Sequence, residues 1–173
     1  MSRFVFVTGG ARSGKSDFAM RLAEEASRDR VYVATAKALD SEMEDRVRRH
    51  QEARGEGWRT VEEPVDIVRA VAEAGGGAVV VDCLTLWLTN MLMESDGDIE
   101  EKASAGAAEL ASAFKRMPGT SIVVSNEVGL GIVPADALTR KFRDASGRVN
   151  RIVAEAADEV YMVVSGIPVR IKP

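Results

Sequence analysis

Short, continuous apolar runs rich in β-branched residues recur along the chain, and polar, helix-compatible segments separate them. The runs are Phe4–Thr8, Val31–Thr35, Ala78–Asp82, Ser121–Ser125 and Val160–Val164. Because they are apolar throughout rather than alternating with polar residues, they indicate strands buried on both faces. Such strands form mainly parallel sheets flanked by helices, so the pattern predicts a doubly wound α/β fold.

The intervening segments have the composition and periodicity of helices. The end of the chain differs, because Val160–Ser165 and Val169–Lys172 read as two strands joined by a tight turn at Gly166-Ile167-Pro168, which predicts an antiparallel edge. No repeat or low-complexity linker interrupts the pattern, so we expect one domain over residues 1–173. The predicted helices are Lys15–Ser27, Asp40–Arg54, Val65–Ala74, Thr85–Met93, Asp98–Arg116 and, in two pieces, Asp136–Asp158.

Composition narrows the class of protein. The 173 residues are 46% hydrophobic, enough for a proper core, and carry a net charge of −4. Because basic residues are dispersed among at least as many acidic ones, we expect small-molecule substrates and no general affinity for nucleic acid. The single cysteine cannot form an internal disulfide. Neither an export leader nor an apolar run near the ~20 residues of a membrane span is recognisable, which predicts a soluble, cytoplasmic protein.

The segment Gly9–Ser16, Gly-Gly-Ala-Arg-Ser-Gly-Lys-Ser, directly follows the first predicted strand and precedes a predicted helix. In that context its spacing is typical of a phosphate-binding loop, whose backbone N–H groups point at phosphate oxygens. Lys15 is then expected to reach the terminal phosphates and Ser16 to face Mg²⁺. A glycine-rich turn without a ligand is the alternative, which the order of strand, loop and helix disfavours. The motif predicts a nucleotide user without specifying the reaction.

Asp82 ends the strand Ala78–Asp82, at the edge of the sheet where the phosphate loop is expected. Its alternative role is to cap the helix that follows. Given the loop, the better interpretation is an acid on the magnesium side of the nucleotide.

His50 is the only histidine of the chain. On the predicted helix, Arg46, His50 and Arg54 are spaced i, i+4 and i+8, so they share one face. Arginine binds phosphate oxygens bidentately, cationic neighbours favour the neutral imidazole, and a neutral imidazole nitrogen can attack phosphorus. Spacing alone, however, favours a solvated, charged helix on which the histidine is incidental.

Taken together, the motifs resemble one family, the bifunctional adenosylcobinamide kinase / adenosylcobinamide-phosphate guanylyltransferases of cobalamin assembly. The resemblance runs along nearly the whole chain. Its carriers are Thr8–Ser16, Tyr32–Thr35, Asp40–Met43 with Arg46 and His50, Trp58–Thr60 with Glu62, Asp82–Thr85 with Asn90, Ser125–Pro134, Phe142–Asp144 with Gly147–Asn150, and Ala157-Asp158 before Val163–Pro168.

This resemblance implies two reactions on one corrinoid. An NTP, ATP or GTP, phosphorylates the aminopropanol hydroxyl of adenosylcobinamide. GMP is then transferred from GTP to that phosphate with release of pyrophosphate, after being held on a histidine. That histidine maps onto His50, so the resemblance reverses the preference drawn from spacing, and Lys15 is the second catalytic residue.

The resemblance also implies a RecA-like P-loop fold, Mg²⁺ held by Ser16 and Asp82, and a homo-oligomer, namely a trimer with active sites between subunits. The two alternatives are a plain small-molecule kinase, in which His50 has no role, and an NTP-binding regulatory module. The nucleotide-binding residues carried over are Gly9, Gly10, Ala11, Arg12, Ser13, Gly14, Lys15, Ser16, Ala34, Thr35, Ala36, Gln51, Glu52, Ala53, Arg54, Glu62 and Asp82.

Four further parts of the chain have weaker claims. Glu127, in Ser125–Gly129 after the fourth predicted strand, would polarise an attacking hydroxyl or simply belong to a polar turn. Phe142–Asp144 and Arg148–Asn150 would clamp phosphate or corrin side chains, or make subunit contacts. Trp87 fits a core anchor as well as a site residue.

Overall fold

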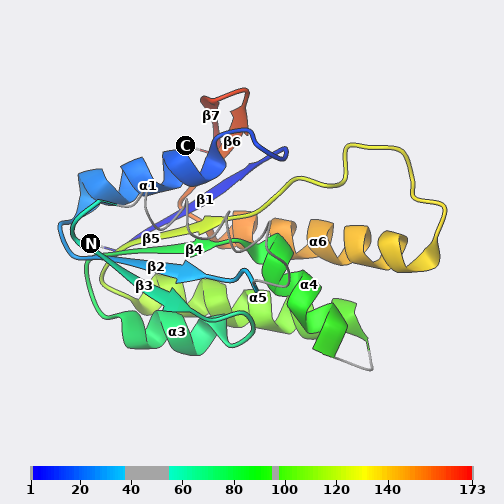
Figure 1. Cartoon of the computed structure of the whole chain (residues 1–173), viewed down its shortest axis with the longest axis horizontal. Helices are drawn as coiled ribbons and strands as arrows, with labels where there is room; N and C mark the ends of the chain where they lie inside the picture. Colours follow the sequence, from blue (N-terminus) through cyan, green and yellow to red (C-terminus); the bar gives the residue numbers. More distant parts are fainter. Residues whose placement is uncertain (1, 38–54, 95–97, 173) are drawn as a thin grey trace.

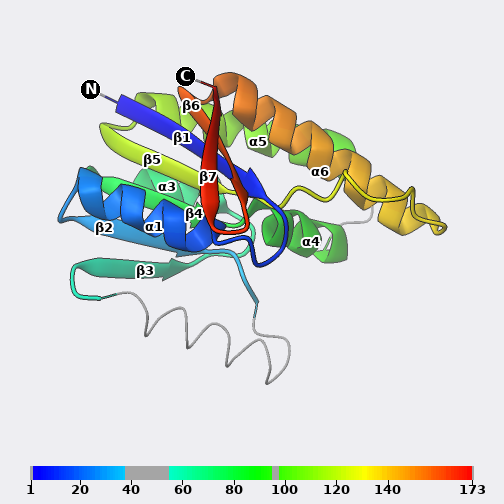
Figure 2. The ribbon, with the colours of Figure 1, turned by 90° about the horizontal axis from the view of Figure 1, so that it is seen from above.

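Seven strands form one sheet in a computed structural model that describes residues 2–37, 55–94 and 98–172. In spatial order the strands are β3, β2, β4, β5, β1, β6 and β7. Neighbouring strands from β3 to β6 are parallel, and only β7 runs antiparallel, against β6. The two edge strands are therefore β3 and β7, and Figure 2 shows β3 along its edge of the sheet. The strands span β1 Ser2–Gly9, β2 Arg30–Ala34, β3 Trp58–Glu62, β4 Ala78–Asp82, β5 Gly119–Val124, β6 Glu159–Val164 and β7 Ile167–Lys172.

Helices cover both faces of the sheet, as Figure 1 shows for α1 on one side and α3 and α5 on the other. Aspartate side chains cap three of them by accepting backbone N–H groups of the first turn, which stabilises each helix by about 1 kcal/mol. Asp66 caps α3, Asp98 caps α5 and Asp136 caps α6. The helices are α1 Lys15–Ala26, α3 Ile67–Ala74, α4 Leu84–Glu94, α5 Ile99–Arg116 and α6 Ala137–Ala156.

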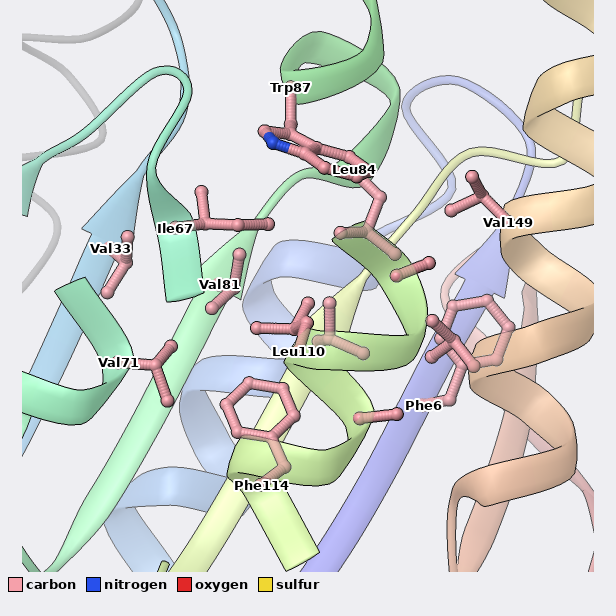
Figure 3. Close-up of a cluster of buried hydrophobic side chains, with 14 of the residues drawn as sticks. Phe6, Val33, Ile67, Val71, Val81, Leu84, Trp87, Leu110, Phe114 and Val149 are labelled. Atoms are coloured by element: carbon pink, nitrogen blue, oxygen red, sulfur yellow. The ribbon is translucent and has the colours of Figure 1, made fainter. Parts of the chain in front are cut away.

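The alternation of side chains along the strands divides the core into two layers. On β1, Phe4 and Phe6 face the layer that packs on α3, α5 and α6, whereas Val5 and Val7 face α1. Figure 3 shows Phe6 within the first layer, with Leu110 and Phe114 of α5. Because both faces are covered, the strands are apolar at nearly every position, which is why their sequence pattern predicted them.

The predicted α/β architecture, with a mainly parallel sheet and an antiparallel edge at the end of the chain, is confirmed. The predicted helix Asp40–Arg54 lies outside the described residues. No helix in the described part of the chain is long and apolar enough to cross a membrane.

Three details of the prediction were wrong. No strand was predicted at Trp58–Glu62, because β3 is a largely exposed edge strand without an apolar run. The two predicted pieces of Asp136–Asp158 form one helix, since Ala145, Val149 and Val153 continue a single buried face at four-residue spacing. The final turn is Ser165-Gly166, which has positive φ at both residues, and Pro168 already belongs to edge strand β7.

Glu159 joins three strands at the amino-terminal side of β6. Its carboxylate accepts hydrogen bonds from Arg3 of β1 at 2.7 and 3.1 Å and from the Tyr161 hydroxyl at 2.7 Å, and it lies 3.4 Å from the Arg170 guanidinium of β7. The hydrogen bonds from Arg3, followed by that from Tyr161 and the charges of both arginines, lower the pKa of Glu159 from 4.5 to about 2 despite partial burial.

Glu159→Gln is therefore expected to lower the free energy of unfolding by about 1–3 kcal/mol at pH 7. A carboxylate with a depressed pKa stabilises the fold above its unfolded-state pKa and loses that contribution as the pH falls. The difference in the free energy of unfolding between the parent protein and the variant should thus shrink as the pH falls from about 4.5 toward 2. Urea denaturation at pH 7 and pH 3 measures it, with the exposed Glu155→Gln as control. Equal differences at both pH values would contradict the assignment.

Candidate nucleotide site at the carboxyl edge of the sheet

The Gly9–Ser16 loop connects β1 to α1 and depends on two glycines. Gly9 has a φ of 148°, and a Cβ atom there would lie 2.4 Å from the carbonyl oxygen of Val163 on the neighbouring strand. Gly14 precedes α1 with a φ of 90°. A side chain at Gly9 would collide with β6, so glycine is what allows β1 to turn into the loop here.

Lys15 folds back over this loop. Its side chain is buried, and Nζ lies 2.5 Å from the carbonyl oxygen of Gly10 and 3.4 Å from Ser13 Oγ. The first backbone N–H groups of α1 have no partner within the helix and carry partial positive charge. The loop therefore combines an ammonium group with a helix N-terminus, an arrangement suited to phosphate.

Two segments distant in sequence hold the loop. Gly166, in the turn between β6 and β7, donates its N–H to the carbonyl oxygen of Ser13 at 2.9 Å. Glu127, after β5, donates its N–H to the carbonyl oxygen of Gly9 at 3.0 Å. Within the loop, Gly10, Ala11 and Arg12 are exposed, so this outer part is open to a ligand.

Asp82 lies at the same edge of the sheet as the loop. Its strand, β4, is two strands from β1, which corresponds to about 10 Å. Asp82 alternates in phase with Val80, whose side chain packs in the same layer as Phe18 of α1. The half-buried Asp82 carboxylate therefore lies on the side of the sheet that carries α1 and Ser16.

Thr35 joins the ends of β2 and β4. Its N–H donates to the Asp82 carbonyl oxygen at 3.1 Å, and its hydroxyl bonds both the N–H of Cys83 at 2.7 Å and the carbonyl oxygen of Cys83 at 2.8 Å. The Thr35 side chain is thus fully buried. Burial and, secondarily, the charge of Asp82 raise the pKa of the Cys83 thiol to about 12, so Cys83 is unsuited as a nucleophile.

Glu62 ends β3 at the far edge of the sheet and is exposed. It aligns with Ala34 of β2, which in turn aligns with Asp82 of β4. Glu62 is therefore about 10 Å from Asp82 and four strands, about 19 Å, from β1. The predicted binding residues that the structure describes fall into two groups, one at the loop and one along β4, β2 and β3.

The predicted nucleophile and its neighbours lie outside the described residues. These are His50, Gln51, Glu52, Ala53 and Arg54, together with Arg46. They belong to the connection between β2 and β3, the strands that carry Ala34 and Glu62.

A polar junction beside the loop was not predicted as a unit. Thr85 Oγ1 accepts the N–H of Asn126 at 2.9 Å and lies 3.5 Å from Ser125 Oγ. The amide of Asn150 on α6 donates to the Asn126 carbonyl oxygen at 3.1 Å. The Glu127 carboxylate accepts the N–H of Gly129 at 2.7 Å. This hydrogen bond closes a polar turn, which is one of the two roles that the sequence left open for Glu127. The sequence motifs that contain these residues were recognised separately. No rule of sequence spacing predicts that Asn150 contacts Asn126, so the junction could not be predicted.

Trp87 belongs to the core. Its side chain is buried, and its indole N–H donates to the Val65 carbonyl oxygen at 2.8 Å. Figure 3 shows it above Leu84 and Ile67. Of the two roles that the sequence left open for Trp87, the structure supports the core anchor.

The oxygen atoms at this edge suit magnesium bound together with a nucleotide. Among the described residues, no group of three or more His, Cys, Asp or Glu side chains could hold a metal ion. Mg²⁺ usually binds through one or two protein oxygens, with phosphates and water completing the shell. The Ser16 hydroxyl and the Asp82 carboxylate fit that requirement.

Comparison with solved structures identifies the fold. One solved ATPase domain superimposes with a TM-score of 0.55 and 15% identity, covering 93% of this chain and 69% of that one. The P4 protein from bacteriophage phi6, solved in complex with ADP, superimposes with a TM-score of 0.52 and 12% identity. That match covers 96% of this chain and 52% of the P4 chain. These likenesses confirm the predicted RecA-like P-loop fold.

Comparison with known sequences identifies the family. The bifunctional adenosylcobalamin biosynthesis protein CobU of Escherichia coli is 42% identical over 180 residues, covering 97% of this chain and 99% of that protein. The bifunctional adenosylcobalamin biosynthesis protein CobP of Pseudomonas aeruginosa is 42% identical over 169 residues, covering 96% of this chain and 95% of that protein. The family model CobU matches residues 5–171. The chain therefore belongs to the cobinamide kinase / cobinamide phosphate guanyltransferase family.

Proposed function

We propose that the chain catalyses two successive transfers on one corrinoid at the carboxyl edge of its sheet. In the first, ATP or GTP phosphorylates the aminopropanol hydroxyl of adenosylcobinamide. In the second, GMP from GTP is transferred to that phosphate, giving adenosylcobinamide-GDP and pyrophosphate. The observation that carries this proposal is the Gly9–Ser16 loop with Lys15 folded over it, in a chain that matches a kinase and guanyltransferase family over residues 5–171.

In the kinase step, the loop holds the β- and γ-phosphates. Its backbone N–H groups and the Lys15 ammonium face negative charge that increases on the phosphate oxygens during transfer. Ser16 and Asp82 hold the magnesium ion, which when bound neutralises phosphate charge. Because the loop is tied to Gly166 and Glu127, its donors are oriented before the nucleotide binds.

In the guanylyl step, an imidazole nitrogen of His50 attacks the α-phosphorus of GTP. The N–P bond forms as the bond between the α-phosphorus and its bridging oxygen breaks, and pyrophosphate leaves. The phosphate of the corrinoid then attacks the same phosphorus and releases His50. Ala34–Ala36, the residues from Gln51 to Arg54, and Glu62 bind the guanosine part, which is supported by the alignment of Ala34 and Glu62 on neighbouring strands.

Lys15→Ala is expected to reduce phosphorylation of adenosylcobinamide by about 100-fold or more, because the variant lacks the ammonium that contacts the phosphates. Transfer of label from γ-labelled ATP to the corrinoid measures the loss. Lys115→Ala is the matched control, since Lys115 is exposed in the last turn of α5. Undiminished phosphorylation by the Lys15 variant would show that the loop does not serve this step.

GTP labelled at the α-phosphate is expected to leave an acid-labile, alkali-stable GMP adduct on the protein, and His50→Asn should abolish it. These stabilities are those of a phosphorus–nitrogen bond to histidine. Denaturing gels after acid or alkali treatment give the measurement. A plain kinase, or a regulatory module that only binds nucleotide, forms no adduct at saturating GTP and magnesium, and that result would refute the guanylyl step.

A homo-oligomer, with the trimer expected from the family resemblance, completes the proposed cytoplasmic enzyme. Two exposed apolar surfaces support the assembly. The first is the loop surface, Leu130, Ile132 and Val133, which are 80, 97 and 61% exposed in the segment that extends beyond the sheet in Figure 1. The second is the hairpin surface on β7, formed by Ile167, Val169 and Ile171. Exposed apolar groups gathered in this way are typical of subunit contacts.

The double substitution Ile167→Ser and Ile171→Ser is expected to lower the mass in solution from that of the oligomer to that of one chain, because it removes apolar area from the interface. Light scattering coupled to size exclusion measures the mass. Met93→Ser, an exposed apolar residue on α4, is the control. A monomeric parent protein would contradict the assembly, and an unchanged oligomer in the double variant would exclude the hairpin surface.

A further inference from the structure

We propose that Tyr32 is a positioning residue that orients the carboxylate of Asp82 toward the magnesium ion of the bound nucleotide. This inference rests on the magnesium role proposed above for Asp82. Its basis is a direct contact, because the Tyr32 hydroxyl donates a hydrogen bond to Asp82 Oδ2 at 2.7 Å.

The two residues reach each other by strand register. Tyr32 lies on β2 beside Val80 of β4, and Asp82 is two positions further along β4, on the same face. That face carries α1, whose first turn includes Ser16. The tyrosine therefore contacts the carboxylate from the core layer between the sheet and α1. The nucleotide loop lies on the other side of the carboxylate, toward the carboxyl edge of the sheet.

The Tyr32 ring has little freedom to move. It is 4% exposed and packs in the same core layer as Phe18 and Ala19 of α1. It makes a T-shaped contact with the ring of Trp58 on β3, with centroids 6.1 Å apart and an interplanar angle of 77°. A hydroxyl on a ring held from two sides fixes the direction of its hydrogen bond before any ligand arrives.

The hydrogen bond distinguishes the two carboxylate oxygens. Oδ2 accepts from Tyr32, while Oδ1 makes no hydrogen bond within the part of the chain that the structure describes. A rotation of about 90° about the Cβ–Cγ bond would move the accepting oxygen away from the hydroxyl and break the bond to Tyr32, so the hydrogen bond fixes the plane of the carboxylate. The tyrosine thus keeps one oxygen directed away from itself and able to bind a cation, which is how outer-shell groups orient metal ligands.

A purely structural role would be to fasten β2 to β4. That connection already exists, because the strands pair from Arg30–Ala34 to Ala78–Asp82 and Thr35 bonds both Asp82 and Cys83 beyond the last pair. The Tyr32 hydroxyl adds a hydrogen bond to the carboxylate side chain of Asp82 rather than to the backbone of β4. Its loss is therefore expected to change magnesium dependence more than stability.

The chain provides a matched control in its other tyrosine. Tyr161 also donates to a carboxylate at 2.7 Å, but its acceptor is Glu159, which binds Arg3 and lies away from the nucleotide loop. Tyr32→Phe and Tyr161→Phe thus each remove one tyrosine hydroxyl and one hydrogen bond from a hydroxyl to a carboxylate. Only the first deletion should affect Asp82.

The experiment titrates magnesium into each protein with a fluorescent methylanthraniloyl derivative of ATP and records nucleotide binding. Tyr32→Phe is expected to raise the magnesium concentration at half-maximal binding about 10-fold. Binding without magnesium and the melting temperature should change little. Tyr161→Phe should leave the magnesium dependence unchanged.

Asp82→Asn separates the inference from its foundation. If Asp82→Asn raises the magnesium requirement and Tyr32→Phe does not, Asp82 acts without Tyr32 and the inference is wrong. If neither variant alters the requirement, the proposed magnesium role of Asp82 fails, and the inference fails with it. A much lower melting temperature of the Tyr32→Phe protein, together with an unchanged magnesium dependence of nucleotide binding, would establish a structural role for Tyr32 instead.

Discussion

The parallel hydrogen-bond register of the sheet is the constraint on which the rest of the structure depends. It brings the carboxyl ends of β1, β4, β2 and β3 to one edge, so that the loop after β1, Asp82, Ala34 and Glu62 lie along a single line. The same register forces a close approach at Gly9, where only the absence of a side chain lets β1 leave the sheet beside the Val163 carbonyl. Buried strands supply the rigidity, and the loops at their ends supply the chemistry.

The geometry of this edge suits an enzyme that acts on different phosphorus atoms in successive steps. The loop lies about 19 Å from the end of β3, with Asp82 between them, about 10 Å from each. Under the proposed function, the loop presents a terminal phosphate for one reaction, and the β2 and β3 ends belong with the segment that carries the predicted nucleophile. Residues at the two ends of this edge then serve the two transfers, with Asp82 between them.

The sequence predicted those parts whose physics is local. Continuous apolar runs predicted the buried strands, and the strand, loop and helix around Lys15 predicted the loop. Edge strand β3 was missed because an exposed strand needs no apolar run. The hydrogen bonds from Asn150 to Asn126 and from Tyr32 to Asp82 depend on packing between elements far apart in the chain, so no local pattern contains them. The orientation of Asp82 is therefore a property of the fold rather than of its motif.

A crystal structure with magnesium and a non-hydrolysable ATP analogue tests the central claim most directly. We expect the β- and γ-phosphates within the Gly9–Ser16 loop, the Lys15 ammonium moved from the Gly10 carbonyl onto phosphate oxygen, and the magnesium ion near Ser16 and Asp82. Phosphates bound elsewhere, with Lys15 still on Gly10, would contradict it.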